Sequence, residues 1–323
     1  MPGMEIYDLK HSWHVSYKNT NWHYLLKLPR IWKVVRDIKP DILIAIFLSS
    51  YGILGALVRL KKCPLVTRVC GSDIFVFPKR SFLHRFVTRF ALSRADLIIS
   101  VAQHMTQTLS DYMVNDKLVL TQQYGIDTNL FFPPHEAASS RSPVCLSNRA
   151  MVPICNLETI LLSAHKLEAQ GSPVHINLAG DGEQSKFLKQ KAGKLKLRDR
   201  VSFVGNIDHA RMPEELRSAS IYVSMSLSDG TSISLIEAMA CGAFPVVSDI
   251  PANREWITDG VNGYLVSPDS PDQLAQRLND AWNRPELRQT AAERNWSIIR
   301  EKGDYKKNMA IIESALIGLA EKS

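Results

Sequence analysis

The chain has 323 residues, of which 45% are hydrophobic and 22% are charged, and its formal net charge is +7. This length gives room for two domains, and the composition is ordinary for a soluble globular protein, which excludes a disordered or membrane-embedded chain. The positive charge does not by itself indicate nucleic acid, because no nucleic-acid-binding module accompanies it, and we expect no nucleic-acid partner.

The cysteines and the first residues bear on the compartment. The five cysteines are odd in number and widely separated, and no spacing among them suggests a zinc site. We therefore expect reduced thiols in a cytoplasmic protein. Residues 1–14 lack the apolar core of a signal peptide. The longest early apolar run, residues 42–48, is far too short to span a bilayer.

The first part of the chain alternates strand-like and helix-like segments. We expect strands at residues 4–9, 42–48, 65–69, 97–101 and 118–122, and helices at 22–39, 50–60, 82–91 and 103–112. Alternation at this spacing is typical of a parallel sheet covered by helices. The polar, proline-containing stretch 135–143 follows and is the best candidate for a linker.

A second α/β set follows this linker. We expect strands at residues 144–147, 174–179, 201–204, 221–225 and 245–247, helices at 157–169, 183–194, 213–218, 233–241 and 271–282, and one or two more helices within 285–319. The sequence therefore predicts an α/β protein with two Rossmann-like domains, residues 1–134 and 144–296, followed by a C-terminal helix within 297–323.

The strand–loop–helix–strand unit between residues 221 and 249 is the most informative segment. Its helix begins near Thr231 or Ser232, which are both plausible N-caps, and ends before Gly242. Sheets of this kind bind ligands at the carboxyl ends of their strands. Gly230 lets the backbone approach a ligand closely, and the N–H groups at a helix start suit a phosphate.

Two carboxylates bracket this helix start. Asp229 lies in the preceding loop, and Glu237 lies about one turn into the helix. Two acceptors beside an anion site fit a nucleotide-sugar, which joins phosphates to neutral hydroxyls, better than a bare polyphosphate. From spacing alone, it is an equally good interpretation that neither carboxylate binds a ligand, with Asp229 an ordinary turn residue and Glu237 a solvated helix residue, since strand–turn–helix units are common.

The wider sequence favours the first interpretation. From Asp229 it reads Asp-Gly-Thr-Ser-x-Ser-Leu-x-Glu-Ala-Met-Ala-Cys-Gly and runs into Pro-Val-Val. This string closely resembles the donor-site signature of the retaining glycosyltransferases of family 4, the group 1 glycosyltransferases with the GT-B fold. The likeness continues through residues 250–257 and 260–266.

The resemblance implies roles for five residues. Asp229, which stands where Glu is commoner in the family, would hold hydroxyls of the transferred sugar. Backbone N–H groups of Gly230, Thr231 and Ser232 would be offered to the sugar and the phosphates. Glu237 would bind the hydroxyls of the ribose.

Arg149 follows the strand at 144–147, where an arginine can meet a diphosphate in bidentate fashion. A surface arginine in a loop is an equal alternative from sequence alone. Family members usually carry an arginine here and a lysine about five residues later, and both contact the donor phosphates. The arginine is present, but Ile154 stands at the lysine position, so one cationic contact is missing.

Three glycines and one aspartate complete the predicted site. Gly180 and Gly182 resemble the family's Gly-x-Gly turn after a strand, and Gly205 resembles the loop that cradles the nucleoside base, although such residues are more often ordinary tight turns. Asp73 lies near Cys70, which replaces a histidine common in the family. Asp73 resembles an acid that would orient the acceptor or assist its hydroxyl, and a helix-capping role explains it nearly as well.

The segment from Lys79 to Arg94 is basic and amphipathic. Its apolar residues recur at helical spacing among arginines: Phe82, Leu83, Phe86, Val87 and Phe90. The helix rests on an anionic membrane surface or packs this stripe on the sheet, and we favour packing on the sheet. The two are compatible if the stripe faces inward and the arginines face outward.

The beginning of the chain departs from the family pattern. Family members open with an apolar strand and a glycine-rich loop, whereas residues 1–9 resemble the strand that follows these elements. The resemblance therefore omits the first β-α unit, and the N-terminal domain is expected to be incomplete.

By resemblance, we expect two domains facing across a cleft, with the C-terminal helix packing back on the first. The implied protein is a cytoplasmic, membrane-peripheral glycosyltransferase of surface-polysaccharide synthesis. It moves a sugar from a nucleotide-diphosphate-sugar to a glycan or lipid-linked acceptor with retention of the anomeric configuration, and it needs no cofactor or metal.

One alternative is a non-catalytic subunit that binds nucleotide-sugar or a partner enzyme, which the missing first β-α unit, Cys70 and Ile154 all favour. A sugar-nucleotide epimerase is weaker, because its acid/base residues are not evident.

Overall fold

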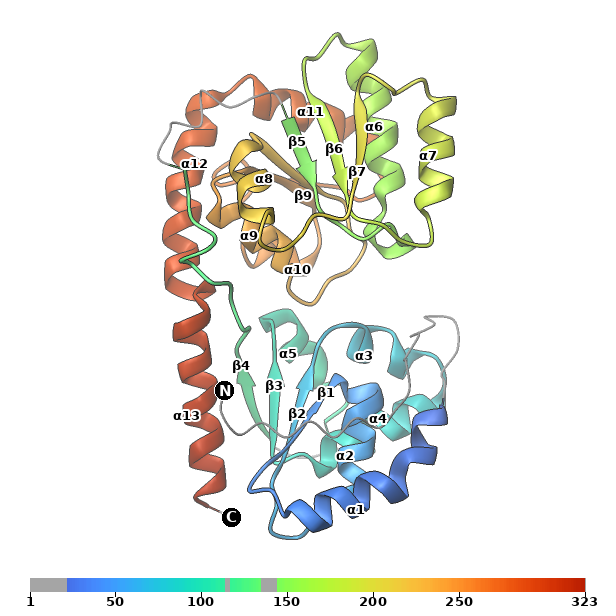
Figure 1. The fold of residues 1–323 in the computed structure, drawn as a ribbon, viewed down its shortest axis with the longest axis vertical. Coiled ribbons are helices and arrows are strands. Elements are labelled where there is room, and N and C mark those ends of the chain that lie inside the picture. Colours follow the sequence, from blue (N-terminus) through green and yellow to red (C-terminus); the bar gives the residue numbers. More distant parts are fainter. Residues whose placement is uncertain (1–21, 114–116, 135–143, 323) are drawn as a thin grey trace. The chain divides into compact units, whose positions relative to one another are not determined.

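The computed structural model describes residues 22–113, 117–134 and 144–322. They form two compact units (Figure 1). The first unit comprises the described residues of Met1–Ser100, Thr108–Leu120 and Ala315–Ser323, and the second those of Val101–Gln107 and Thr121–Ser314. The strand expected at 4–9 and the linker expected at 135–143 lie outside the described residues.

A four-stranded sheet in the order β1-β2-β3-β4 is the centre of the first unit. Its strands are β1 (Leu43–Ile46), β2 (Leu65–Val69), β3 (Leu97–Ser100) and β4 (Leu118–Thr121). The pairs β1–β2 and β2–β3 are parallel. Every residue of β3 is buried, as expected for an inner strand of a parallel sheet covered by helices.

The helices of the first unit follow the expected alternation. They are η1 (Trp22–Lys27), α1 (Leu28–Ile38), η2 (Phe47–Gly52), α2 (Ile53–Val58), α3 (Ser72–Phe75), η3 (Phe77–Lys79) and α4 (Phe82–Arg94). α5 (Gln103–Leu109) begins in the second unit and ends in the first. α2 contacts both α1 and α4. The single turn α3, directly after β2, is not among the expected elements.

Only part of the apolar stripe predicted for α4 packs inward: Phe90 packs against a core that includes Ala45 of β1 and Leu65 of β2. Phe82 is 85% exposed, Leu83 58% and Phe86 59%. α4 instead buries Thr88, Ala91 and Leu92. The prediction of inward packing is therefore wrong for Phe82, Leu83 and Phe86, because the later part of the helix supplies the side chains that cover the sheet.

A six-stranded sheet in the order β10-β9-β8-β5-β6-β7 is the centre of the second unit. Its strands are β5 (Val144–Ser147), β6 (His175–Ala179), β7 (Val201–Gly205), β8 (Ile221–Ser224), β9 (Phe244–Ser248) and β10 (Tyr264–Val266), and all neighbours are parallel. The chain runs outward from β5 to β7, returns to β8 and runs outward again to β10. The direction therefore switches between β5 and β8, where sheets of this kind form ligand sites.

Helices cover both faces of this sheet. The helices of the second unit are η5 (Pro153–Cys155), α6 (Leu157–Ala169), α7 (Ser185–Lys194), α8 (Met212–Ser218), α9 (Ile233–Ala240), α10 (Pro251–Arg254), α11 (Pro271–Trp282), α12 (Pro285–Ile298) and η6 (Ile299–Gly303). α13 (Tyr305–Ala320) begins in the second unit and ends in the first. One core joins α6, α7 and α11 to the sheet, and a second core joins α8 and α9 to it. Successive strand residues alternate between the two cores, as Cys145 and Leu146 do.

The segment after β4 is joined to the segment between η6 and α13. The backbone N–H of Ile126 donates to the carbonyl of Gly303 at 2.9 Å, and the N–H of Tyr305 donates to the carbonyl of Ile126 at 2.9 Å. Gly125 has φ +82°, and a Cβ there would lie 2.5 Å from the Gly303 carbonyl oxygen. Only glycine permits this close approach.

Candidate functional site

Two loops meet at the carboxyl ends of β5 and β8. Arg149 follows β5 and Asp229 follows β8, and Nη2 of Arg149 lies 2.8 Å from Oδ2 of Asp229. Only 17% of the Arg149 side chain and 19% of the Asp229 side chain are exposed. The structure thus brings together two of the three residues predicted to be catalytic, at the switch in strand order.

Arg149 is also anchored on the start of α9. Its Nη1 donates to Oγ of Ser234 at 2.9 Å and to Oγ of Ser232 at 3.2 Å. Burial opposes the positive charge, but the neighbouring Tyr222 and Asp229 outweigh it and raise the pKa of Arg149 above its ordinary value. The sequence prediction missed Ser234, although the Ser-x-Ser pattern of the motif contains it.

The first turn of α9 has a defined cap. Ser232, one of the two expected N-caps, accepts a hydrogen bond from the N–H of Leu235 through Oγ at 3.4 Å. Thr231 has another task, because its hydroxyl donates to the carbonyl of Val101 at 2.8 Å. Gly230 is buried beside them. Leu235 is already bonded to the cap, so Ile233 and Ser234 are the residues of this first turn whose N–H groups can be offered to an anion, because the first N–H groups of a helix lack i−4 carbonyl partners.

Glu237 lies further along α9. It is only 8% exposed, and burial raises its pKa from 4.5 to about 7. Residues three positions apart are neighbours on a helix surface, so Glu237 shares a face of α9 with Ser234. A carboxyl group of this pKa is available near neutral pH both as a carboxylate acceptor and as a protonated donor.

The three predicted glycines have structural reasons to be glycine. Gly180 has φ +123°, and a Cβ there would lie 2.8 Å from the carbonyl oxygen of Arg149. A Cβ on Gly182 would lie 2.5 Å from the carbonyl oxygen of Met151. Gly205 has φ +74° and accepts a hydrogen bond from the N–H of Gly180 at 2.7 Å. Gly180 and Gly182 therefore let the β6–α7 loop pack directly on the loop that carries Arg149.

Asp73, the third residue predicted to be catalytic, belongs to the first unit. It is 1% exposed, and its carboxylate accepts from the N–H of Gly71 at 2.8 Å, of Leu48 at 2.9 Å and of Cys70 at 3.1 Å. Burial raises the pKa of Asp73, while these hydrogen bonds act in the opposite direction. The contacts order the loop after β2, while Asp73 itself lies within α3, whose N-cap position is Gly71 and has no side-chain cap.

Sequence reasoning gave no role to His104 or Glu255, which lie in contact in the second unit. Nδ1 of His104 lies 2.6 Å from Oε1 of Glu255, and Nε2 of His104 lies 3.3 Å from the carbonyl oxygen of Asp229. The available signal was the position of Glu255 within the tract 250–257. The contact itself joins residues 151 positions apart, which no local pattern reveals.

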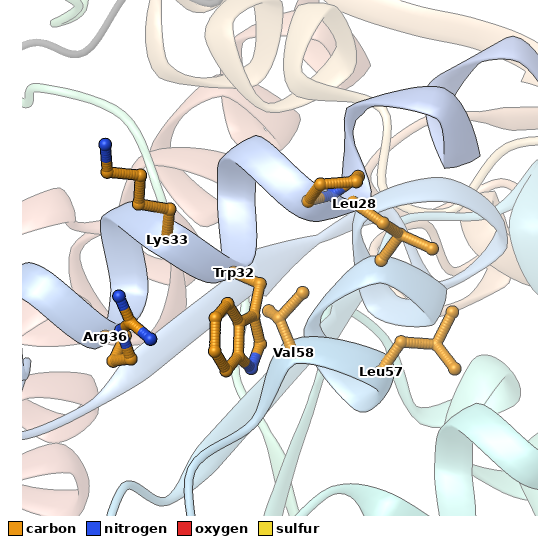
Figure 2. Close-up of a pocket in the computed structure, with 7 residues that line it drawn as sticks. Leu28, Trp32, Lys33, Arg36, Leu57 and Val58 are labelled. Atoms are coloured by element: carbon orange, nitrogen blue, oxygen red, sulfur yellow. The ribbon is translucent and has the colours of Figure 1, made fainter.

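A separate groove of about 570 Å³ lies between α1 and α2 of the first unit (Figure 2). It is lined by Leu28, Pro29, Trp32, Lys33, Arg36, Leu57 and Val58. The guanidinium carbon of Arg36 lies 4.6 Å from the centre of the Trp32 ring. The groove contains no predicted site residue, and it combines apolar walls with two cations.

Within the described ranges, His, Cys, Asp and Glu side chains form no cluster of three or more that would hold a metal ion. All five cysteines are free.

Known proteins resemble this chain in sequence and in fold. An uncharacterized glycosyltransferase of Methanocaldococcus jannaschii is 23% identical over 84% of this chain and 74% of its own length. Sucrose-phosphate synthase from Thermosynechococcus elongatus has a TM-score of 0.82 at 16% identity, over 96% of this chain and 82% of its own. Anabaena HepE, solved with UDP-glucose, has a TM-score of 0.76 at 21% identity, over 89% and 81%.

Two family patterns match the sequence. The family described as "Glycosyl transferase 4-like" matches residues 2–102. The family described as "Glycosyl transferases group 1" matches residues 131–296, slightly more than half of the chain. The expected GT-B fold is confirmed by the structural neighbours, and the chain belongs to the group 1 glycosyltransferases.

Proposed function

We propose that this chain transfers a sugar from a nucleoside-diphosphate-sugar to a hydroxyl group of a glycan or lipid-linked acceptor, with retention of the anomeric configuration. The observation that carries the proposal is the half-buried ion pair of Arg149 and Asp229 beside the start of α9. The neighbour HepE, which was solved with UDP-glucose, supports the donor class. Surface-polysaccharide synthesis is proposed on the motif resemblance alone.

In this proposal the donor lies along the carboxyl ends of β5 and β8. Arg149 and the first turn of α9 hold the diphosphate, because both offer N–H donors and positive charge. Asp229 accepts hydrogen bonds from the transferred sugar, and Glu237 accepts them from the ribose. Gly180, Gly182 and Gly205 keep the neighbouring loops close to this place without contacting the donor through side chains.

Arg149 also acts in the chemical step. Negative charge grows on the diphosphate as its bond to the sugar breaks, and a cation already in place stabilises that charge without reorganising. Ser232, Ser234 and Asp229 supply this fixed placement. We propose that this arrangement operates without a metal ion or cofactor. We further propose that Asp73 orders the loop that orients the acceptor.

The test is transfer by the full chain from a panel of UDP-, GDP- and ADP-sugars, with the product anomer assigned by NMR. Replacing Arg149 by Lys removes the bidentate contact of the guanidinium with the diphosphate and should lower kcat/KM by on the order of 10²-fold. The matched control is Arg254→Lys, which alters the exposed pair of Arg254 with Asp249 and should leave activity unchanged. Full activity of Arg149→Lys would contradict the proposal, and an inverted anomer would refute retention.

A non-catalytic subunit that binds nucleotide-sugar is the second candidate. Ile154, which is 43% exposed, supplies no cation where the family pattern has lysine. Asp73 already accepts three backbone hydrogen bonds, which leaves it poorly suited to proton transfer. Donor binding in calorimetry, combined with no transfer or hydrolysis for any sugar and acceptor, would establish this candidate over the enzyme.

We also propose that α4 rests on an anionic membrane surface and so meets a lipid-linked acceptor. Phe82, Arg85, Phe86 and Arg89 recur at i, i+3, i+4 and i+7 and therefore share one face of the helix. Phe82, Arg85 and Phe86 are exposed. Aromatic rings that enter the acyl boundary, with arginines at the phosphates, are typical of helices that lie in a membrane interface.

The surroundings of α4 support the same partner. α2 lies between α1 and α4 in the first unit (Figure 1). Its Leu57 is 48% exposed and lines the groove that Lys33 and Arg36 border. The same combination of apolar and cationic groups thus recurs beside α4.

Among the described residues, no helix is long and apolar enough to cross a bilayer.

Co-sedimentation with phosphatidylcholine vesicles, with and without phosphatidylglycerol, tests the membrane proposal. The double variant Phe82→Ser/Phe86→Ser should reduce partition to the anionic vesicles about tenfold or more. The control is Ile317→Ser, since Ile317 is 59% exposed on α13, whose last turn carries no basic residue. Equal binding of the double variant, or equal binding of the wild type to neutral vesicles, would contradict the proposal.

A further inference from the structure

His104 lies between two acceptors of the second unit. Its Nδ1 is 2.6 Å from Oε1 of Glu255, and its Nε2 is 3.3 Å from the carbonyl oxygen of Asp229. The side chain is 14% exposed. The same imidazole therefore contacts a carboxylate on one side and, on the other, the backbone of a residue that the donor site uses.

The chemistry of the two contacts determines where the ring hydrogens are. A carbonyl oxygen accepts only, and so does an ionised carboxylate. Burial raises the pKa of Glu255, but hydrogen bonds from His104 and from the N–H of Gln103 outweigh it and leave that pKa below its ordinary value. Glu255 is therefore ionised, and a neutral imidazole can donate to only one of its two acceptors. Both contacts are satisfied only when both ring nitrogens carry hydrogen.

A second contact holds the same loop. The hydroxyl of Thr231 donates to the carbonyl of Val101 at 2.8 Å, and Glu255 accepts the N–H of His104 at 2.8 Å. The loop from Asp229 to Thr231 is thus joined at both ends to the segment Val101–Gln107. Arg149 holds the carboxylate of Asp229, and His104 contacts its carbonyl.

We propose that His104 is a positioning residue of the donor site: protonated on both ring nitrogens, it donates to Glu255 and to the Asp229 carbonyl and fixes the loop that presents Asp229, Gly230 and Thr231. The inference rests on the proposed function, because it gives that loop the task of holding the donor. His104 acts through the loop, and it needs no contact with the donor.

Other charged groups around this contact have acceptors of their own. Lys302 donates to the backbone carbonyl of Glu255 and lies 4.3 Å from the centre of the Trp256 ring. Arg149 pairs with the carboxylate of Asp229. Neither cation takes the two oxygens that the His104 ring contacts, so the positive charge of the ring is balanced by Glu255.

Two substitutions separate the two contacts of the ring. The amide of Asn reaches about as far as Nδ1, and the amide of Gln reaches about as far as Nε2. His104→Asn should keep the donor to Glu255, lose the one to Asp229 and raise the KM for the nucleotide-sugar about tenfold, with a smaller effect on kcat. His104→Gln should stay within about threefold of the wild type, because a donor still faces the Asp229 carbonyl.

The control is His165→Gln, since His165 is exposed on α6, and it should leave KM unchanged. An unchanged KM in His104→Asn, or a loss in His104→Gln as large as in His104→Asn, would overturn the proposal. Thermal unfolding of each variant shows whether the fold is retained.

A second arm needs no substrate. The full chain is labelled with ¹⁵N-histidine, and its ring nitrogens are observed by NMR. The signals of His104 are those that disappear in His104→Gln. Both nitrogens of His104 should have the chemical shifts of a doubly protonated ring at the pH of the assay, and shifts of a neutral tautomer would overturn the proposal. If the wild type transfers no sugar, the proposed function fails, while this arm still decides the state of His104.

Discussion

Glu237 is a carboxyl group with little access to water. It is 8% exposed, and burial raises its pKa from 4.5 to about 7. Between these two pH values the folded chain binds more protons at this residue than the unfolded chain does. Stability therefore falls as the pH rises from about 4.5 to about 7, and the cost is complete above about 7.

Replacing Glu237 by Gln should remove this cost. Above pH 7 the variant should be more stable than the wild type by up to about 3 kcal/mol, and near pH 4 the two should be alike. The measurement is urea unfolding at both pH values. Glu293→Gln, a change of an exposed glutamate on α12, is the control and should show no such dependence. A difference that does not change with pH would contradict the burial argument.

The affinity for the nucleotide-sugar should increase as the pH rises, whereas the stability of the chain decreases. If the carboxylate of Glu237 accepts the ribose hydroxyls, binding of the nucleotide-sugar strengthens as the pH rises through about 7. Glu237→Gln should bind more weakly at high pH in spite of its greater stability. Isothermal titration calorimetry across this range measures the effect, and an affinity that is flat with pH in the wild type would count against the ribose contact.

Sequence reasoning and structure agree on some site residues and not on others. Asp229 and Ser232 follow from the motif, and Arg149 follows from its place after a strand and from the family resemblance. His104 and Ser234 were missed. The bond from His104 to Asp229 joins residues 125 positions apart, and Ser234 gains its importance from an arginine in another loop. Such contacts depend on tertiary folding, which local patterns do not contain.

At the level of elements, the loop after β6 depends on glycine. A Cβ on Gly182 would lie 2.5 Å from the Met151 carbonyl oxygen, so the backbone must move to accept a side chain. Gly182→Ala should destabilise the chain by about 1–3 kcal/mol and weaken donor binding, because the Arg149 loop shifts. Denaturant unfolding and calorimetry measure the two effects.

Gly193 provides the matched control. It lies within α7 and has open space around a built Cβ. Gly193→Ala should stabilise the chain by about 0.5–1 kcal/mol, because alanine loses less backbone entropy in a helix. Equal effects of the two substitutions would show that the close approach at Gly182 is unimportant.

The elements were easier to predict than their orientation. The extent of α4 follows from the spacing of its apolar residues, but the prediction that they pack inward was wrong for Phe82, Leu83 and Phe86. Periodicity shows that a helix has an apolar face and does not show what covers that face. The short elements α3, α10 and β10, each of three or four residues, were not predicted, since they are too brief to display a period.

At the level of the whole molecule, the net charge of +7 should act on membrane binding. The Debye length falls from about 10 Å at 0.1 M salt to about 3 Å at 1 M, so attraction to anionic vesicles weakens steeply. The bound fraction in co-sedimentation should fall with added NaCl, and the part due to Phe82 and Phe86 should persist. Binding that is independent of salt would indicate that the charges play no part.

The fold class of the whole molecule was predictable, whereas the strand order was not. Alternating apolar runs and amphipathic segments indicated parallel sheets with helices on both faces, and the structure confirms this. The placement of β8 beside β5 depends on how each crossover packs over the sheet. That placement creates the switch point, and so the meeting of Arg149 with Asp229 was inferred only through the family resemblance.

The bridge between Ile126 and the segment Gly303–Tyr305 bears on recombination between relatives. A chimaera that takes the part of the chain up to β4 from a relative should keep residues 123–128 and 299–305 from one and the same parent. If residues 123–128 came from one parent and residues 299–305 from the other, a parent without glycine at position 125 would place a side chain against the Gly303 carbonyl. The crossover point is therefore best placed before residue 123, so that both segments joined by the bridge come from the same parent.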